Sequence, residues 1–324
     1  MASTCASAPS RSASSRSTRA SIDRRRRRAR RFAFVHRRNA VSVEASPDGT
    51  SLERVLEAAV RAAKEGGTVM ARKVGAEVIK TKANARDLLT EVDGEVQRII
   101  EAKVAEEFPH HGFLGEESVA AGKDASADAL REVLETGPEW LWVVDPIDGT
   151  TNFVHGLPLS AISIGVAYKG ELQVAVIMDP FRDECFTAVL GGGAKLNGTP
   201  IKVGEEATAL EAVVVTGYAP TDASTEVMLK GMTALATLPV RTIRMFGSAA
   251  IMLAWVACGR VTAYFEADLN SWDTAAGALL IREAGGRMTN LVGEEYDLTV
   301  RPILASNGAT HDELLRCLMS TQRC

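Results

Sequence analysis

The sequence predicts an α/β fold in which helices and sheets are stacked in layers. Helical patterns open the folded part, strand patterns separated by turns occupy the middle, and strands alternate with helices in the last third. Hydrophobic residues make up 46% of the 324 positions, which is enough for a large core. This order is typical of a layered sandwich rather than of a barrel. We expect one domain built from two halves, 46–200 and 201–324.

Charge is distributed unevenly along the chain. The formal net charge is −4, but residues 1–45 contain twelve Arg and only two acids, a balance of +10 that leaves −14 for the rest. Nucleic acid is therefore not the expected partner of the acidic body. The sequence contains no run of about eighteen apolar residues, the length that would predict a membrane-spanning helix. We therefore expect no membrane partner.

Residues 1–45 are predicted to be a disordered organellar transit peptide. They are rich in Ser, Ala and Arg, poor in acids and free of a long apolar run, which distinguishes them from a secretory signal. The Met-Ala-Ser start and the high Ser content favour the chloroplast stroma over the mitochondrion, with cleavage near residues 41–46. The arginine run 24–28 also fits a nucleic-acid or nuclear-import patch.

Two helices are expected to open the folded domain. Apolar residues at helical spacing follow the capping-box pattern Thr50–Glu53, and Gly66-Gly67 is expected to end or loosen this helix. The polar segment Glu77–Asp87 predicts a loop or hairpin. A second helix begins at Thr90, with Asp93 in the position of a capping-box acid.

A stretch near the middle of the chain combines a strand with a polar turn. The apolar run Leu141–Val144 is of buried-strand type. Asp145 is expected to end the strand, and Pro146 to prevent further pairing. Asp148-Gly149 is a turn signal, and Thr150-Thr151 can start a helix. Carboxylates at the carboxyl end of a strand lie where ligands bind in α/β sheets, and hard oxygen ligands suit Mg²⁺. The alternative is a turn whose aspartates only cap backbone groups.

Further elements follow this stretch. We expect an antiparallel meander of about four strands with a hairpin at Asn197-Gly198, and an exposed connection at residues 119–137. The predicted strands are Leu159–Tyr168, Leu172–Met178, Glu184–Val189, Ala212–Thr216, Val240–Arg244, Val261–Phe265 and Pro302–Ala305. The predicted helices are Ser224–Ala236, one from Gly247-Ser248-Ala249 to Gly259, Trp272–Glu283 with Ser271 as cap and Gly285 behind it, and His311–Met319.

Three motifs resemble the signature of the inositol monophosphatase family. They are Gly115–Ser118, Leu141–Phe153, and Ser271–Gly277 followed by Glu283–Gly286. They occur in the family's order and at family-like spacing, and the resemblance covers roughly Ser51 to the C-terminus. It implies a Mg²⁺-dependent, lithium-sensitive phosphoric monoester hydrolase with the αβαβα sandwich of the inositol monophosphatase and fructose-bisphosphatase type.

The resemblance also implies a site for two or three Mg²⁺ per subunit. Four acids from three distant segments would repel each other if they converged, and bound cations would explain their convergence. The implied ligands are Glu116, Asp145 and the carbonyl of Ile147 for one ion, and Asp145, Asp148 and Asp273 for a second. A third, weaker ion is implied near Glu116. An acid in the first turn of a helix is also favoured by the helix dipole, which is the structural alternative for Asp273.

Catalysis is assigned by the same resemblance. Thr150, with Asp93 behind it and Glu116 beside it, is implied to orient an attacking water and take its proton. Asp93 has a structural alternative as a helix cap. The implied substrate-binding residues are Gly149, Thr150 and Thr151, through backbone N–H groups, together with Gly247, Ser248, Ala249 and Glu266. Asp268 stands where the family often has Gly, and it is open whether Lys80 or Lys82 approaches the site.

The expected reaction is the hydrolysis of myo-inositol 1-phosphate to myo-inositol and phosphate. The residues Thr151–Gly156 favour the inositol branch. L-Galactose 1-phosphate, histidinol phosphate, fructose bisphosphate and adenosine bisphosphate are alternative substrates, and a plastid scaffold subunit with a weak site is a non-enzymatic alternative. The partner is a small phosphorylated polyol, and the family implies a homodimer. No cysteine belongs to a C-x-x-C pair or lies near His at zinc spacing. Cys5 is expected to leave with the transit segment, and the others are interpreted as reduced, mostly structural thiols: Cys185, Cys258, Cys317 and Cys324.

Overall fold

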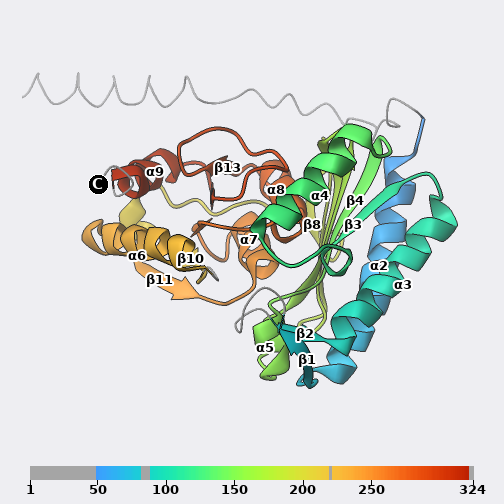
Figure 1. Ribbon diagram of the computed structural model, residues 1–324. Coiled ribbons are helices and arrows are strands. Elements are labelled where there is room, and N and C mark those ends of the chain that lie inside the picture. Colours follow the sequence, from blue (N-terminus) through green and yellow to red (C-terminus); the bar gives the residue numbers. More distant parts are fainter. Residues whose placement is uncertain (1–48, 82–87, 219–220, 321–324) are drawn as a thin grey trace, which may run out of the picture. The chain divides into compact units, whose positions relative to one another are not determined.

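The computed structural model describes residues 49–81, 88–218 and 221–320. Within the chain, Val43–Cys324 forms one compact unit. The predicted transit segment lies outside the described residues, as do Lys82 and Cys324. In the described part, five layers follow one another in the order helices, sheet, helices, sheet, helices (Figure 1). This confirms the predicted layered αβαβα fold.

The larger sheet has seven strands in the order β3-β4-β5-β6-β7-β8-β9. Only β3 and β4 are parallel, and every other neighbouring pair is antiparallel. The predicted meander is present and runs from β5 to β9, with the expected hairpin at Asn197-Gly198. The strands are β3 (Gly112–Gly115), β4 (Trp140–Asp148), β5 (Ala161–Tyr168), β6 (Glu171–Asp179), β7 (Glu184–Val189), β8 (Gly193–Leu196) and β9 (Thr199–Pro200).

Strand β4 is longer than predicted. We expected it to end at Asp145, but it continues to Asp148 because the register shifts between these two residues. Asp145 pairs with Ser163 and Asp148 pairs with Ala161, so β4 has one residue more than β5 over this interval. A β-bulge of this kind leaves its extra residue unpaired, and Pro146, which has no N–H, is tolerated there.

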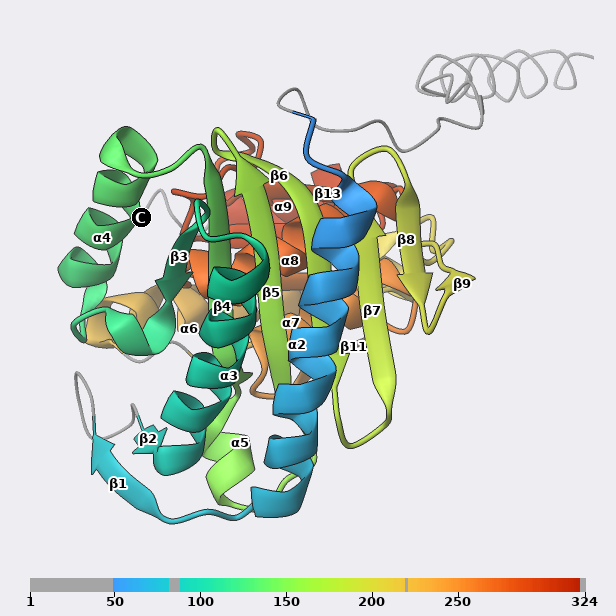
Figure 2. The ribbon, with the colours of Figure 1, turned by 90° about the vertical axis from the view of Figure 1, so that its right-hand side faces the viewer.

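Helices α2 (Leu52–Lys73) and α3 (Glu91–Glu107) cover one face of this sheet (Figure 2). The prediction that Gly66-Gly67 ends the first helix is wrong. Gly66 instead permits close packing, since a Cβ there would lie 2.8 Å from Ile162 Cδ1 and 2.9 Å from Val96 Cγ1. The cap of α2 is Ser51, one residue after the predicted position.

The smaller sheet has the strand order β11-β10-β12-β14-β13. One face of this sheet packs on the helices between the two sheets, and the other face packs on the outermost helices. The strands are β10 (Val213–Thr216), β11 (Thr242–Met245), β12 (Ala263–Glu266), β13 (Arg287–Asn290) and β14 (Ile303–Ser306). The helices are α7 (Ala249–Ala257) and α8 (Ser271–Glu283) between the sheets, and α6 (Asp222–Thr237) and α9 (His311–Ser320) outside. Strand β13 was not predicted, because four residues that include Arg, Thr and Asn give no apolar run.

Three smaller elements complete the fold. The expected loop or hairpin is a two-stranded sheet of β1 (Val78–Thr81) and β2 (Leu88–Thr90). The predicted exposed connection is a helix, α4 (Lys123–Thr136), because Leu130 on one of its faces is buried in the core. The short helix α5 (Thr150–Val154) follows β4. No described helix is long and apolar enough to cross a membrane.

Helix α8 packs unusually close to the larger sheet. A Cβ at Gly165 of β5 would lie 2.7 Å from Ala275 Cβ and 3.1 Å from Ala276 N. Nearby, the Ser163 hydroxyl donates a hydrogen bond to the carbonyl oxygen of Trp272 at 2.9 Å. The N-cap of α8 is Asn270 rather than the predicted Ser271. These contacts fix the start of α8 against the sheet.

Candidate active site

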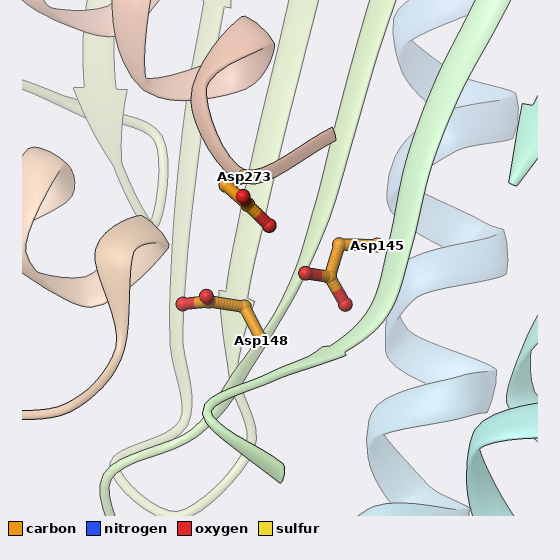
Figure 3. A group of neighbouring side chains, drawn as sticks. All are labelled: Asp145, Asp148 and Asp273. Carbon is orange, nitrogen blue, oxygen red and sulfur yellow. The ribbon is translucent and has the colours of Figure 1, made fainter. Parts of the chain in front are cut away.

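Three aspartates from two distant segments meet at the ends of β4 and α8 (Figure 3). Asp145 and Asp148 flank the bulge of β4, and Asp273 lies in the first turn of α8. Each contributes one carboxylate oxygen to a group whose members all lie within 4.8 Å of one another. Asp145 is 3% exposed and Asp148 is 7% exposed, so the group is largely shielded from water.

Backbone N–H groups orient two of these carboxylates locally. Ile147 N donates to Asp145 Oδ1 at 2.9 Å, inside the bulge itself. Asp148 Oδ2 accepts hydrogen bonds from Ala250 N at 2.8 Å and from the Ser248 hydroxyl. The start of α7 therefore holds Asp148 from the opposite side of the site.

The third carboxylate is held by the residue that caps its helix. Asn270 N donates to Asp273 Oδ2 at 2.6 Å. A carboxylate oxygen of Asp145 lies within 4.8 Å of one of Asp273. Charged carboxylates this close repel each other unless a cation or a proton lies between them.

Burial, together with the neighbouring acids, raises the pKa values of two of these carboxyl groups. Burial raises the pKa of Asp148 to about 6, although its hydrogen bonds lower it. Burial, followed by the charges of Asp148 and Glu116, raises the pKa of Asp273 well above its ordinary value. A cation would relieve both effects, and carboxylate oxygens are the ligands that Mg²⁺ and Ca²⁺ prefer. The residues present therefore fit a divalent metal ion.

Glu116 lies beside this group without belonging to it. It follows β3 at the start of the turn Glu116–Ser118, and its charge raises the pKa of two of the aspartates. Gln97 fastens this turn, because its Nε2 donates to Ser118 Oγ at 2.8 Å and its Oε1 accepts from Glu117 N at 2.9 Å. No motif pointed to Gln97, which lies in the middle of α3.

Asp93 makes hydrogen bonds that fit both of the roles considered for it. Its Oδ2 accepts hydrogen bonds from Thr90 N at 2.9 Å and Thr90 Oγ1 at 2.6 Å, which completes the cap of α3. Its Oδ1 lies 3.3 Å from Thr150 Oγ1. The Thr150 hydroxyl also lies 3.0 Å from the Ile147 carbonyl oxygen. One hydroxyl proton can be donated to only one acceptor at a time, so these two oxygens compete for it.

The predicted substrate side begins at Glu266, the last residue of β12. It is buried, and Tyr264 donates its hydroxyl proton to Glu266 Oε2 at 2.5 Å. Burial raises the pKa of Glu266 to about 7. A Cβ at Gly217 would overlap Glu266 Oε2, so only glycine leaves room for this carboxylate. Sequence reasoning missed Tyr264 and Gly217 because neither belongs to a recognisable motif.

The start of α7 supplies structural support as well as part of the expected substrate side. Ser248 caps α7 by accepting from Ile251 N at 3.2 Å, while its proton goes to Asp148. Its hydroxyl is therefore already engaged with an acid of the site. Ala249, the first residue of α7, is nearly buried, and Thr151 is exposed in the first turn of α5.

Gly149 allows α5 to begin close to the start of α7. Its φ is +88°, and a Cβ there would lie 2.9 Å from Leu159 O and 3.0 Å from Gly247 O. Asn152 ties the two segments together, because its Nδ2 donates to Leu159 O at 2.8 Å and Phe246 O at 2.7 Å. The predicted phosphate-side residues are thus gathered with the acids.

Comparison with known proteins decides the family. Residues 51–323 match the sequence profile of the inositol monophosphatase family. The chain belongs to this family. It is 37% identical over 278 residues to inositol monophosphatase 2 of Solanum lycopersicum, covering 84% of this chain and 100% of the relative. It is also 37% identical over 268 residues to the Nus factor SuhB of Pseudomonas aeruginosa, covering 82% and 95%.

Solved structures of the family share this fold. An IMPase of Thermotoga maritima is 31% identical with a TM-score of 0.72, over 84% of this chain and 98% of that one. An inositol monophosphatase of Anabaena is 34% identical with a TM-score of 0.70, over 83% and 96%. The family membership makes this protein a phosphoric monoester hydrolase of a metal-dependent family, acting on small phosphorylated substrates.

Proposed function

We propose that this protein hydrolyses myo-inositol 1-phosphate to myo-inositol and phosphate with Mg²⁺. The observation that carries the proposal is the convergence of three aspartates near the Thr150–Asp93 pair. Glu266 is a further buried acid, close enough to Asp148 for their negative charges to repel each other. A family structure with 27% identity and a TM-score of 0.65 is described as bound to inositol monophosphate. A relative of similar identity is named Nus factor SuhB rather than inositol monophosphatase. The substrate is therefore tested directly below.

The acids of the site would hold the metal. We assign Asp145, Asp148 and Asp273, with Glu116 and the Ile147 carbonyl, to two or three Mg²⁺ per subunit. When bound, such ions stabilise the attacking and leaving oxygens of an in-line phosphoryl displacement. The raised pKa values of Asp148 and Asp273 support this assignment, because they report carboxylates that lack a compensating charge.

The chain itself would prepare the attacking water. When the Thr150 hydroxyl donates its proton to Asp93 Oδ1, its lone pairs are left to accept a hydrogen bond from water. Thr150, with Glu116 beside it, then orients the water and takes its proton while the hydroxyl proton of Thr150 passes to Asp93 Oδ1. The N–H groups of Gly149, Thr150 and Thr151 contact the phosphate oxygens.

The polyol would lie against β12 and α7. Glu266 accepts hydrogen bonds from ring hydroxyls, and its own position is fixed by Tyr264. The small side chain of Ala249, together with Gly247 and Ser248, leaves room for the ring. Since Ser248 already donates to Asp148, we expect its side chain to act on the substrate through that acid.

A panel of substrates tests the proposal. Turnover with Mg²⁺ should be compared for inositol 1-phosphate, L-galactose 1-phosphate, histidinol phosphate, fructose bisphosphate and adenosine bisphosphate. We expect the highest kcat/KM for inositol 1-phosphate, loss of activity on chelation, and inhibition by millimolar Li⁺. A higher kcat/KM for another ester would reassign the substrate, and no turnover of any ester would favour the scaffold alternative.

We further propose a chloroplast location and a homodimer. The balance of +10 in residues 1–45 ahead of a −14 body supports the first, and the family resemblance supports the second. A fusion of residues 1–60 to a fluorescent protein should enter plastids and be processed, whereas unprocessed nuclear accumulation would contradict it. Light scattering of the processed protein should give twice the chain mass.

A further inference from the structure

One arginine, Arg301, joins several segments around the site. Its Nε donates to Asp268 Oδ1 at 2.7 Å. Its Nη1 donates to Asn270 Oδ1 at 2.8 Å and to Ser126 Oγ at 3.1 Å. Its backbone oxygen accepts from Leu269 N at 3.1 Å. The side chain of Arg301 is 18% exposed and that of Asp268 is 6% exposed, so this is a largely buried ion pair.

The segment that Arg301 holds carries two acids of the site at its ends. Glu266 precedes it at the end of β12, and Asp273 follows it in the first turn of α8. Asn270 connects the arginine to Asp273 directly, because its side chain accepts from Arg301 while its backbone N donates to Asp273 Oδ2 at 2.6 Å. Only one residue therefore separates the guanidinium from the carboxylate of Asp273.

A second anchor comes from α4. Ser126 is nearly buried and belongs to the helix that follows the turn of Glu116. Lys123 of the same helix lies 3.8 Å from Asp268, but its side chain is 60% exposed, so its contribution is screened by solvent. Arg301 is thus the less exposed of the two cations beside Asp268, and it ties this segment to α4.

We infer that Arg301 is a positioning residue that holds Asp273 in place for a divalent cation. The inference rests on the proposed function in one respect, since it takes Asp273 as a metal ligand. Residues that orient metal ligands through hydrogen bonds typically contribute about 10–100-fold to metal affinity or activity. The planar guanidinium is needed because it presents several N–H groups in a fixed fork, which a lysine ammonium cannot reproduce.

The test is Arg301→Lys, which keeps a positive charge beside Asp268 but loses the fork. We expect Mg²⁺ affinity, measured by calorimetry and by the Mg²⁺-dependent rise in Tm, to weaken about 10-fold, the low end of the effect of such residues. The activity should recover at high Mg²⁺ concentration, with kcat near that of the wild type. The matched control is Arg287→Lys, since Arg287 pairs with Asp312 at 2.9 Å outside this network; its Mg²⁺ affinity should be unchanged.

A second variant protects the test against misfolding. Arg301→Met combined with Asp268→Asn removes both charges, so neither is left buried without its partner. This variant should also bind Mg²⁺ more weakly. Normal Mg²⁺ affinity in Arg301→Lys or in the double variant, even with a lower Tm, would overturn the inference. Wild-type protein that binds no Mg²⁺ would instead overturn the proposed function, and this inference with it.

Discussion

Thr150 Oγ1 and Asp93 Oδ1 lie 3.3 Å apart, although the two residues are separated by 57 positions. The other oxygen of Asp93 completes the cap of α3. One carboxylate therefore fixes the start of a helix and faces the hydroxyl assigned to the attacking water. The two roles use different oxygen atoms, so a substitution of Thr150 can test one role while the cap stays intact.

Thr150→Ala should reduce kcat and spare Mg²⁺ binding. The hydroxyl carries no charge, so its loss leaves the carboxylates intact. Positioned proton transfer typically contributes about 10²–10⁴-fold, and the loss of kcat should lie in that range. Single-turnover kinetics and Mg²⁺ calorimetry on the same protein give both quantities. Thr150→Ser, which keeps the hydroxyl, is the control and should retain most activity. A fully active Thr150→Ala enzyme with a lowered Tm would show that Thr150 is only structural.

Asp93→Asn should lower both stability and kcat. An amide has one acceptor oxygen, so it cannot serve Thr90 and Thr150 with a carboxylate's two oxygens. Loss of a helix cap typically costs about 0.5–2 kcal/mol of the free energy of unfolding. The double variant with Thr150→Ala should be little slower than Thr150→Ala alone, because residues that act as a unit are not additive. Multiplied losses of kcat would argue against a Thr150–Asp93 unit.

Stability without metal should fall as pH rises through the titration of Asp148. Its ordinary pKa is 3.8, and burial raises it to about 6 in the folded protein. The folded state therefore binds the proton more tightly than the unfolded chain, and this contribution is lost between these two values. A bound cation compensates the charge, so the rise in Tm caused by Mg²⁺ should be larger at about pH 7.5 than at about pH 5. Asp148→Asn should remove most of that difference; an equal Mg²⁺ effect at both pH values would contradict the prediction.

Asp145→Asn should weaken Mg²⁺ binding more than the same change at an acid outside the site. Asp145 is assigned to both ions, and one of its carboxylate oxygens lies within 4.8 Å of one of Asp273. The dependence of rate on Mg²⁺ concentration should move to higher concentrations, and calorimetry should show weaker binding. Asp179→Asn is a suitable control, because Asp179 is a buried acid paired with Arg182 at 2.7 Å. An unaltered Mg²⁺ dependence in Asp145→Asn would refute the assignment.

Gly165→Ala should destabilise the protein by separating α8 from the sheet. The added methyl group would meet Ala275 Cβ and the backbone N of Ala276, neither of which can rotate away. Overpacking of this kind typically costs about 1–3 kcal/mol of the free energy of unfolding. Urea denaturation measures this value. Gly170→Ala would be a poor control because the φ of Gly170 is positive, whereas Gly94→Ala, whose nearest neighbour is the flexible end of Arg98 at 3.5 Å, is suitable.

Local patterns predicted most of the fold because strands and helices here follow their own periodicities. Asp145, Asp148 and Asp273 were found because they lie in recognisable motifs. Gln97 and Arg301 were not found, because their importance comes from contacts with residues far along the chain. The same is true of Gly66 inside α2, because its close packing against Ile162 of β5 cannot be read from its neighbours in the sequence.

The bulge in β4 has a consequence for the length of the central motif. Side chains three positions apart in a regular strand point to opposite faces. Between Asp145 and Asp148, however, the partner strand advances by only two positions, from Ser163 to Ala161, so both acids project toward α8. The chemistry of the site thus depends on one extra residue in β4. Substitutions within this interval can be tolerated, but a single deletion would remove the bulge: the two carboxylates would keep to one face by regular alternation, yet lose the turn in which Ile147 N holds Asp145 Oδ1.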